Sequence, residues 1–239
     1  MKQRFSAIIF LLLISTGYAQ VKSISFFADY SLPLSKRLAV TKIDAVGGGV
    51  ELRFKVYENY SIGFNGGYNL YSIQQDSALK QWNWEFWEIR YRGIVNDALS
   101  KNPNLSATLS PIQKMDLYPF YLTINGEFEL FGNLSIKPHA GAGVLFYTRR
   151  MYLLEEWQKK FDQYNYEFSY SYRNYAEDKS GNPFSFMGGI DLGYEFTEGF
   201  ILDTAVKYFY ILETEGKYGY HHFPMKDVFN IKLGLTFLY

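Results

Sequence analysis

The fold class is decided by one stretch, Phe229-Asn230-Ile231-Lys232-Leu233-Gly234-Leu235-Thr236-Phe237-Leu238-Tyr239, at the end of a chain of 239 residues. Successive side chains of a strand point to opposite faces, so the odd-numbered residues share one wholly apolar face. The even-numbered residues are mostly small or polar. An apolar face, a polar face and a terminal aromatic residue together are what the closing strand of a lipid-facing barrel needs.

Seven further segments alternate in the same way, at residues 24–30, 50–56, 62–70, 120–130, 134–146, 184–196 and 200–212. The sequence therefore predicts an all-β fold, a transmembrane antiparallel up-and-down β-barrel of about eight strands. Ten strands are the alternative, if Trp82–Tyr91 and Tyr164–Tyr172 also cross the membrane. We prefer eight, with Tyr164–Tyr172 running above the membrane as an extension of its neighbour. Met151–Phe161 has helical spacing and is predicted to be a short surface helix.

The connections between these segments support a membrane barrel. Three are predicted to be tight, at Glu58-Asn59, Gly132-Asn133 and Glu198-Gly199. Four are predicted to be long, at residues 31–42, 74–117, 149–183 and 214–226. Outer-membrane barrels have short periplasmic turns and long outer loops, which gives this strict alternation.

The N-terminus and the composition indicate the cellular compartment of the protein. Lys2 and Arg4 precede a short apolar run, and Gly17-Tyr18-Ala19 offers small residues for a peptidase. We therefore expect residues 1–19 to be a signal peptide, cleaved before Gln20, and residues 20–239 to form the barrel domain. The chain has no Cys, which excludes a lipoprotein anchor and disulfides, and its balanced charge argues against a nucleic-acid partner.

The chain resembles small Gram-negative outer-membrane β-barrel proteins of the OmpA/OmpX type, and more closely the PorT-like outer membrane protein beta-barrel family. The resemblance rests on the signal ending before Gln20, the glycine-rich strands such as those at residues 47–52, 141–143 and 188–190, and the aromatic terminus. It implies residence in the cell outer membrane, in contact with its lipid. It also implies insertion by the outer-membrane assembly machinery. The assembly signal would then be formed by Leu233, Leu235, Phe237 and Tyr239.

The residues predicted to point into the barrel carry both signs of charge. They are Glu51, Arg53, Lys55, Glu127, Glu129, Lys137, His139, Asp191, Glu195, Asp203, Lys207 and Lys232. An eight-stranded barrel is just wide enough for side chains to fill, and charges confined there must pair. We therefore predict a plugged lumen crossed by a salt-bridge network, and not a pore.

No arrangement of residues predicts catalysis. His139 is expected to be a member of the lumen network rather than a general base. His221 and His222 lie next to each other in the last outer loop, and a solvated pair is a better interpretation than a metal site. We expect no enzyme activity, no cofactor and no bound metal.

The outer loops are the predicted functional surface. Trp82, Trp84 and Trp87 lie within six positions and could bind sugars or an extracellular or envelope protein. Rings that cap the barrel mouth, or that dip into the outer leaflet, are the favoured interpretation of the same cluster. The predicted function is structural, or one of interaction through the outer loops. The alternative is a narrow porin-like channel or a transporter for small or apolar solutes.

Overall fold

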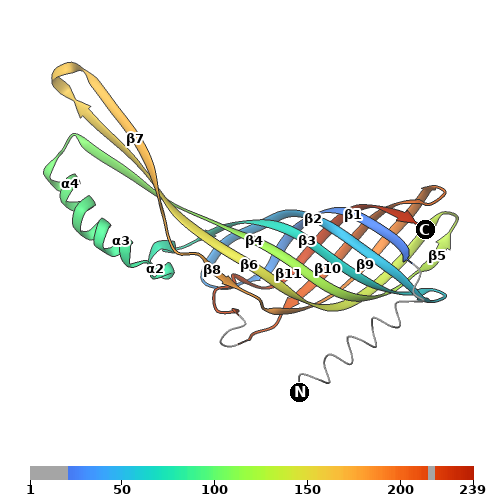
Figure 1. The fold of residues 1–239 in the computed structure, drawn as a ribbon. Coiled ribbons are helices and arrows are strands. Elements are labelled where there is room, and N and C mark those ends of the chain that lie inside the picture. The colour runs from blue at the N-terminus through green and yellow to red at the C-terminus, as the bar shows by residue number, and fades with distance from the viewer. Residues whose placement is uncertain (1–20, 215–218) are drawn as a thin grey trace.

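Antiparallel strands close into a ring, so the protein is a β-barrel (Figure 1). The computed structural model describes residues 21–214 and 219–239, so the predicted signal peptide lies outside the described residues. The ring strands are β1 (Val21–Lys36), β2 (Val40–Tyr57), β3 (Tyr60–Gln75), β4 (Leu105–Gly126), β6 (Leu134–Phe161), β9 (Phe184–Thr197), β10 (Phe200–Ile211) and β11 (Met225–Leu238). Each pairs with the next along the chain, and β11 pairs with β1. The predicted eight-stranded ring is confirmed.

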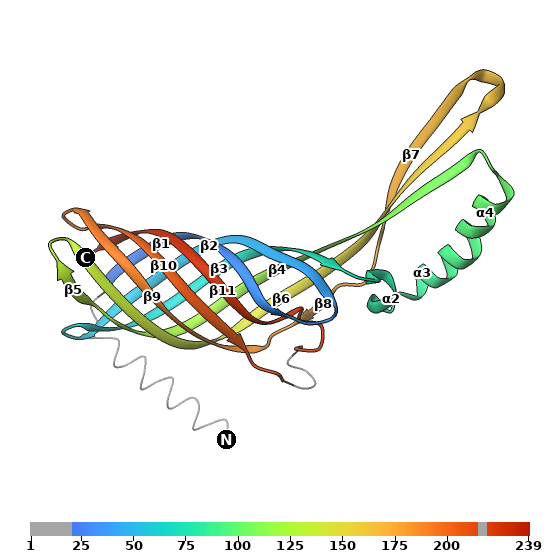
Figure 2. The ribbon, with the colours of Figure 1, turned by 180° about the vertical axis from the view of Figure 1, so that it is seen from behind.

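The three predicted tight turns lie together at the end of the barrel that also holds Tyr239 (Figures 1 and 2). They join β2 to β3, β5 (Phe128–Phe131) to β6 and β9 to β10. The short strand β5 continues β4 after Gly126 and pairs with β6. Gly132 and Gly199 adopt positive φ values of 56° and 79°, which glycine permits without steric cost in such turns.

The first outer connection is short, and its predicted length is wrong. Pairing between β1 and β11 continues as far as Lys36 and Met225. Only residues 37–39 then separate β1 from β2, with Leu38 and Ala39 at positive φ. The strands extend beyond the predicted apolar segments, because backbone hydrogen bonds form whether or not apolar and polar side chains alternate.

The second and third outer connections build a projecting arm, which we call the outer arm (Figures 1 and 2). Its sheet consists of the outer ends of β4 and β6 together with β7 (Tyr166–Tyr175). The helices α2 (Ala78–Trp82), α3 (Glu85–Ile89), the π-helix η2 (Arg90–Val95) and α4 (Asn96–Lys101) run alongside the sheet. A 3-10 turn, η3 (Asp162–Tyr164), links β6 to β7, and β8 (Lys179–Gly181) pairs with β6 nearer the barrel.

The outer arm corrects one prediction and confirms another. Met151–Phe161 is not a helix but the end of β6, where Met151, Leu153 and Trp157 are buried in a period-two pattern. This segment is hydrogen-bonded on both sides, to β4 and to β7, which fixes it as a strand despite its helical spacing. The extension predicted for Tyr164–Tyr172 is confirmed by β7, which pairs with β6 outside the ring. The ten-strand alternative is therefore wrong.

Apolar side chains cover the outside of the ring. Those that are exposed there include Phe26, Phe64, Phe120, Leu122, Phe146, Phe186, Ile190, Leu202, Val206, Ile231 and Leu233. Their inward neighbours along each strand are buried, so the distribution is inverted relative to a soluble protein, whose apolar residues face inward. This belt is suited to the hydrocarbon core of a bilayer.

Tyrosine–aspartate pairs mark the outer edge of the belt. The hydroxyl of Tyr68 donates to Asp116 at 2.7 Å and that of Tyr208 to Asp227 at 3.2 Å. Asp116 also pairs with Arg150 at 2.5 Å. Tyrosine rings with a hydrogen-bonded hydroxyl favour the headgroup level, where ring and hydroxyl are both satisfied. The outer arm therefore begins where the membrane ends.

No helix in the described part of the chain has the length and apolar character required to cross a membrane.

The lipid-facing position of Leu233 can be tested by a charge. We expect Leu233→Arg to lower the free energy of unfolding by about 2–4 kcal/mol, because the residue lies midway along β11 and an arginine there would be placed in hydrocarbon. Leu34 lies on β1, beyond the level of the tyrosine–aspartate pairs. Leu34→Arg should therefore change the free energy of unfolding by close to zero. Denaturant unfolding in phospholipid vesicles measures both. Equal costs at the two positions would contradict the assigned belt.

Candidate functional site

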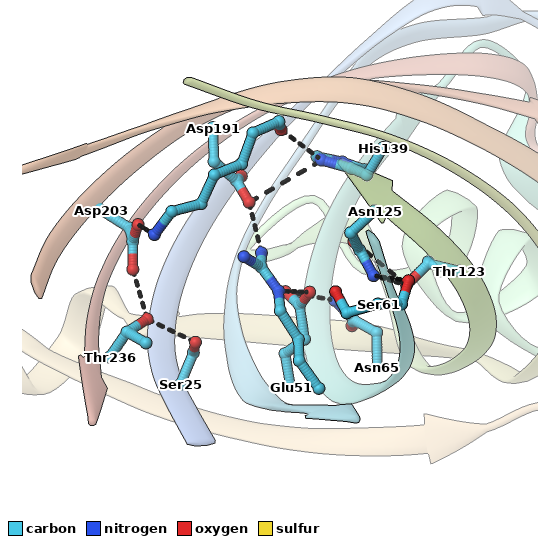
Figure 3. A network of polar contacts seen from close by, with 12 residues as sticks. Ser25, Glu51, Ser61, Asn65, Thr123, Asn125, His139, Asp191, Asp203 and Thr236 are labelled. Atoms are coloured by element: carbon cyan, nitrogen blue, oxygen red, sulfur yellow. Dashed lines mark hydrogen bonds and ion pairs between the residues drawn. The ribbon is translucent and has the colours of Figure 1, made fainter. Parts of the chain in front are cut away.

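The half of the lumen nearer the three tight turns contains a network of buried charges centred on Arg53. Figure 3 shows Glu51, His139 and Asp191 of this network. Arg53 Nε donates to Glu51 Oε1 at 2.7 Å, and Nη2 donates to Asp191 Oδ2 at 2.6 Å. Lys232 Nζ lies 3.5 Å from Glu51 Oε2 and 3.4 Å from Asp191 Oδ1. His139 Nδ1 lies 3.7 Å from Asp191. These side chains come from β2, β6, β9 and β11, so the network ties together strands from opposite sides of the ring.

A second branch follows the wall of the barrel. Lys137 Nζ donates to Asp203 Oδ1 at 3.0 Å, and Asp203 also accepts a hydrogen bond from the hydroxyl of Thr236. Lys137 further lies 3.6 Å from Glu127, which pairs with Lys22 near the turns. The hydroxyls of Thr236 and Ser25 are in contact (Figure 3).

Glycines on β9 make room for these charges. A Cβ atom at Gly193 would lie 2.8 Å from the Lys137 nitrogen and 2.9 Å from an Asp203 oxygen. A Cβ atom at Gly189 would lie 2.8 Å from His139 Nε2. Both glycines face inward, so they are required by the size of the side chains opposite them.

Most residues predicted for the lumen network lie inside the barrel. Buried there are Glu51, Arg53, Lys137, His139, Asp191, Asp203, Lys207 and Lys232, and Glu127 is half-buried. Lys207 has no ion pair in the described part of the chain. Its ammonium lies 5.3 Å from the ring of Phe27, and the side chain borders a small cavity.

Three predicted members of the network lie outside it. Lys55 and Glu129 are exposed, because both strands reach the end of the barrel at these positions. Glu195 is partly exposed and accepts a hydrogen bond from the backbone N–H of Gly199 at 3.0 Å, so it stabilises a turn. Inward and outward side chains alternate to the end of each strand. The strand ends, however, extend beyond the enclosed lumen.

The outer half of the lumen is apolar, which the sequence reasoning missed. Inward-facing Tyr71, Leu117, Tyr121, Leu145 and Met187 pack together there. Phe223, from the last outer loop, is fully buried in this cluster. The signal was present, because the inward positions of β3, β4 and β6 change from polar to apolar towards their outer ends. We call this cluster the apolar plug.

The plug and the network together fill the barrel. The cavity that remains between them measures about 40 Å³ and is bordered by residues such as Asp29, Asn65 and Lys207. A water molecule needs roughly 10–15 Å³ by this kind of measure, so the cavity holds a few waters at most.

The three tryptophans of the second outer connection have different environments. Trp82 is buried against Met151 and Ala176, and its indole N–H donates to the backbone oxygen of Glu177 at 3.1 Å. The ring of Trp84 lies against Phe86 at 5.3 Å, and that of Trp87 stacks on Tyr91 at 4.3 Å. Trp84 also packs against the cluster that contains Trp82, whereas Trp87 lies with Tyr91.

One buried carboxylate holds the outer arm together. Glu155 on β6 is fully buried and accepts two hydrogen bonds from Arg90 of the π-helix, at 2.8 and 3.0 Å. It also accepts hydrogen bonds from Trp157 at 2.9 Å and Asn174 at 2.6 Å. A carboxylate with this many donors is well compensated for its burial. The π-helix and the strands β6 and β7 are thus connected through one side chain.

Aromatic rings form a stripe along one face of the outer arm. Tyr170 stacks on Trp157 with an interplanar angle of 2° and also contacts Phe168 and Tyr172. The rings of Phe161 and Tyr166 pair near the tip. Tyr166, Phe168 and Tyr170 are 57%, 45% and 42% exposed. We call these three residues, with Phe161, the aromatic stripe.

Comparison with known proteins found solved structures that are similar to this chain. The chain is similar to Neisserial surface protein A, at 11% identity and a TM-score of 0.44, over 91% of this chain and 96% of that one. It is also similar to the outer membrane protein OprG from Pseudomonas aeruginosa, at 10% identity and a TM-score of 0.42, over 92% and 97% of the two chains. Ail of Yersinia pestis, solved in complex with a heparin analogue, matches at 10% identity and a TM-score of 0.39, over 92% and 97%.

No family model matches the chain. No curated protein matches it either. The closer resemblance to the PorT-like family therefore stays a prediction.

Ring closure and the apolar belt decide the class of the protein. Every ring strand is hydrogen-bonded on both sides, as a polypeptide in hydrocarbon requires, and apolar side chains face outward. The chain is a transmembrane β-barrel of the outer-membrane type. In this barrel, Leu233, Leu235 and Phe237 of the predicted assembly signal belong to the lipid-facing side of β11, and Tyr239 follows the end of the strand.

Removal of Arg53 tests the lumen network. Arg53→Met should lower the free energy of unfolding by about 3–5 kcal/mol, because it leaves Glu51 and Asp191 buried with too little positive charge. Lys55→Met removes the same charge from the exposed end of the same strand and should change stability by less than about 0.5 kcal/mol. Denaturant unfolding in vesicles compares the two. Similar midpoints for both variants would show that the network does not stabilise the barrel.

Proposed function

We propose that this protein is an interaction protein of the cell outer membrane, in which a closed barrel anchors the outer arm and the arm binds a macromolecular partner outside the cell. The observation that carries the proposal is the construction of the arm. It continues the strands of the barrel as hydrogen-bonded sheet instead of forming an irregular loop. An ordered projection retains its surface without paying the entropy of ordering when a partner binds.

The closed lumen supports an anchoring role for the barrel. Paired charges cross the periplasmic half, and the apolar plug fills the outer half. A hydrophilic solute would have to displace both the ion pairs and the packed rings. Transport of such solutes is therefore not part of the proposal, and neither is catalysis, a cofactor or a metal.

The exposed aromatic stripe supports binding by the outer arm. Tyr and Trp are enriched among the residues that dominate the binding energy of protein interfaces, and flat rings also stack on sugars. The opposite face of the same sheet carries polar residues such as Ser169, Ser171 and Glu167. The contrast between the two faces gives the arm one preferred binding side.

A second candidate is passage of small apolar solutes, and the apolar plug favours it. Side chains such as Leu117, Leu145 and Met187 would be compatible with an apolar molecule entering from the outer end. Phe223 of the last outer loop would have to move, because it fills that end. Uptake of a small hydrocarbon into vesicles that contain the protein would favour this candidate over the first.

Replacement of exposed rings tests binding by the outer arm. Phe168→Ser combined with Tyr170→Ser should weaken attachment of the purified protein to its surface partner by about tenfold or more, because interface aromatics typically contribute this much. Arrays of immobilised glycans and extracellular proteins, probed with the protein in lipid nanodiscs, provide the measurement. The control is Ser169→Ala with Ser171→Ala, on the polar face of the same strand. Attachment that survives loss of both rings would exclude the stripe as the binding surface.

Electrical recording tests the closed lumen. The wild-type protein in planar bilayers should give no stable conductance steps, because ion pairs and packed rings block the path along the barrel axis. Arg53→Met combined with Leu117→Ser would weaken both barriers and serves as the comparison. Regular steps from the wild-type protein would favour a channel and would count against an anchoring role.

A further inference from the structure

Two cations face each other across a strand pair at the mouth of the barrel. Arg149 on β6 and Lys179 on β8 are directly paired residues of an antiparallel ladder. Side chains at such positions have Cβ atoms about 4.5–5.5 Å apart, and like charges directly opposite are destabilising. The fold therefore maintains an unfavourable arrangement at this point.

Arg149 has no carboxylate partner in the described part of the chain. It is 2% exposed, and its guanidinium donates to the amide oxygens of Gln75 and Gln113, each at 2.5 Å. A longer contact, at 3.4 Å, joins it to the backbone oxygen of His222. Its Nε–H has no hydrogen-bond partner among the described residues. Burial lowers the pKa of Arg149 to about 10, as expected for a cation whose charge is not neutralised.

Lys179 adds positive charge beside Arg149, and His222 adds an imidazole. The Lys179 ammonium and the Arg149 guanidinium lie 5.1 and 4.9 Å from the centre of the Trp82 ring. Burial lowers the pKa of Lys179, and the charge of Arg149 lowers it further. The pKa of His222 is lowered by burial and then by Lys179 and Arg149. We call these three residues the cationic cluster.

Lys179 and His222 of the cationic cluster border an open groove. Trp82, Lys179, Ser180 and His222 line a space of about 940 Å³ between the helical segment and the last outer loop. Glu85, Glu177 and Asp178 border the same groove, but none of the three carboxylates forms an ion pair with Lys179 or His222 among the described residues. The groove thus offers one accessible cation, Lys179, and the imidazole of His222, beside the buried Arg149.

We propose that the barrel mouth binds an anionic phosphate or sulfate ester, held by Lys179 and His222 above Arg149. Such a group accepts a charge-assisted hydrogen bond from the Lys179 ammonium and a hydrogen bond from the imidazole N–H of His222. Its negative charge would convert the repulsion between Arg149 and Lys179 into attraction to a shared partner. The Trp82 indole beside it would contact the organic part of the ligand. This site is separate from the aromatic stripe, so it does not depend on binding by the outer arm.

Thermal unfolding of the full chain in detergent tests the site. Inorganic phosphate and sulfate, exchanged for chloride at constant ionic strength, should raise the midpoint of the wild-type protein by mass action. Lys179→Gln and His222→Gln should each need about tenfold more phosphate for the same rise, because each replaces a side chain that donates a hydrogen bond to the anion. Lys159→Gln makes the same change of charge on the outer arm and should respond like the wild type.

Reversal of the charge at Lys179 separates binding from a merely structural role. Lys179→Glu places a carboxylate opposite Arg149, so the midpoint in chloride should rise and the response to phosphate should disappear. A fall of the midpoint in chloride, with the phosphate response retained, would overturn the proposal. An equal response of all variants would also overturn it.

Nanodiscs of phosphatidylcholine, with or without phosphatidic acid, show whether the bound anion is a lipid headgroup or comes from solution. If phosphatidic acid alone raises the midpoint and abolishes the response to added phosphate, the ligand is a lipid headgroup. If the response to added phosphate persists in both membranes, the ligand comes from solution. Both results support the site, whereas no response to either source contradicts it.

Discussion

The structure depends on one constraint, that no backbone hydrogen-bonding group can be left without a partner in hydrocarbon. Pairing of β1 with β11 satisfies it by removing the two open edges of the sheet. Closure of the ring then determines which side chains each face of a strand can carry. One face of every strand must be apolar because it meets lipid, and the other must fill a narrow interior because a ring of this size leaves little free space.

The interior is filled by two different means. Towards the turns, carboxylates and cations such as Glu51, Arg53 and Asp191 satisfy one another, which limits the cost of their burial. Towards the outer end, inward positions carry Tyr, Leu and Met, and the last outer loop adds Phe223. A polar layer would resist slippage of the strands, because its contacts are directional, whereas the apolar layer excludes water from the mouth.

The charges at the two ends of the interior differ in how they are compensated. Within the network, Arg53 is matched by two carboxylates at 2.6 and 2.7 Å. At the mouth, Arg149 meets amide oxygens and a second cation. Beyond the mouth, Glu155 is again fully satisfied and joins the π-helix to the sheet of the outer arm. Among these three charged groups of the described residues, Arg149 is the one without an opposite charge, which agrees with the ligand site proposed at the mouth.

The ring could be predicted from the amino-acid sequence, because alternation is a local property that the strand geometry converts directly into two faces. The sequence therefore predicted the lipid-facing row of β11 and the inward direction of residues such as Arg53 and Asp191. It could not determine where the enclosed space ends, so Lys55 and Glu129 were assigned to the network although they are exposed. It also could not show that Met151–Phe161 is a strand, because pairing with β4 and β7 decides that. Only the tertiary structure placed Arg149 opposite Lys179, because residues 30 positions apart meet only when β8 folds back on β6.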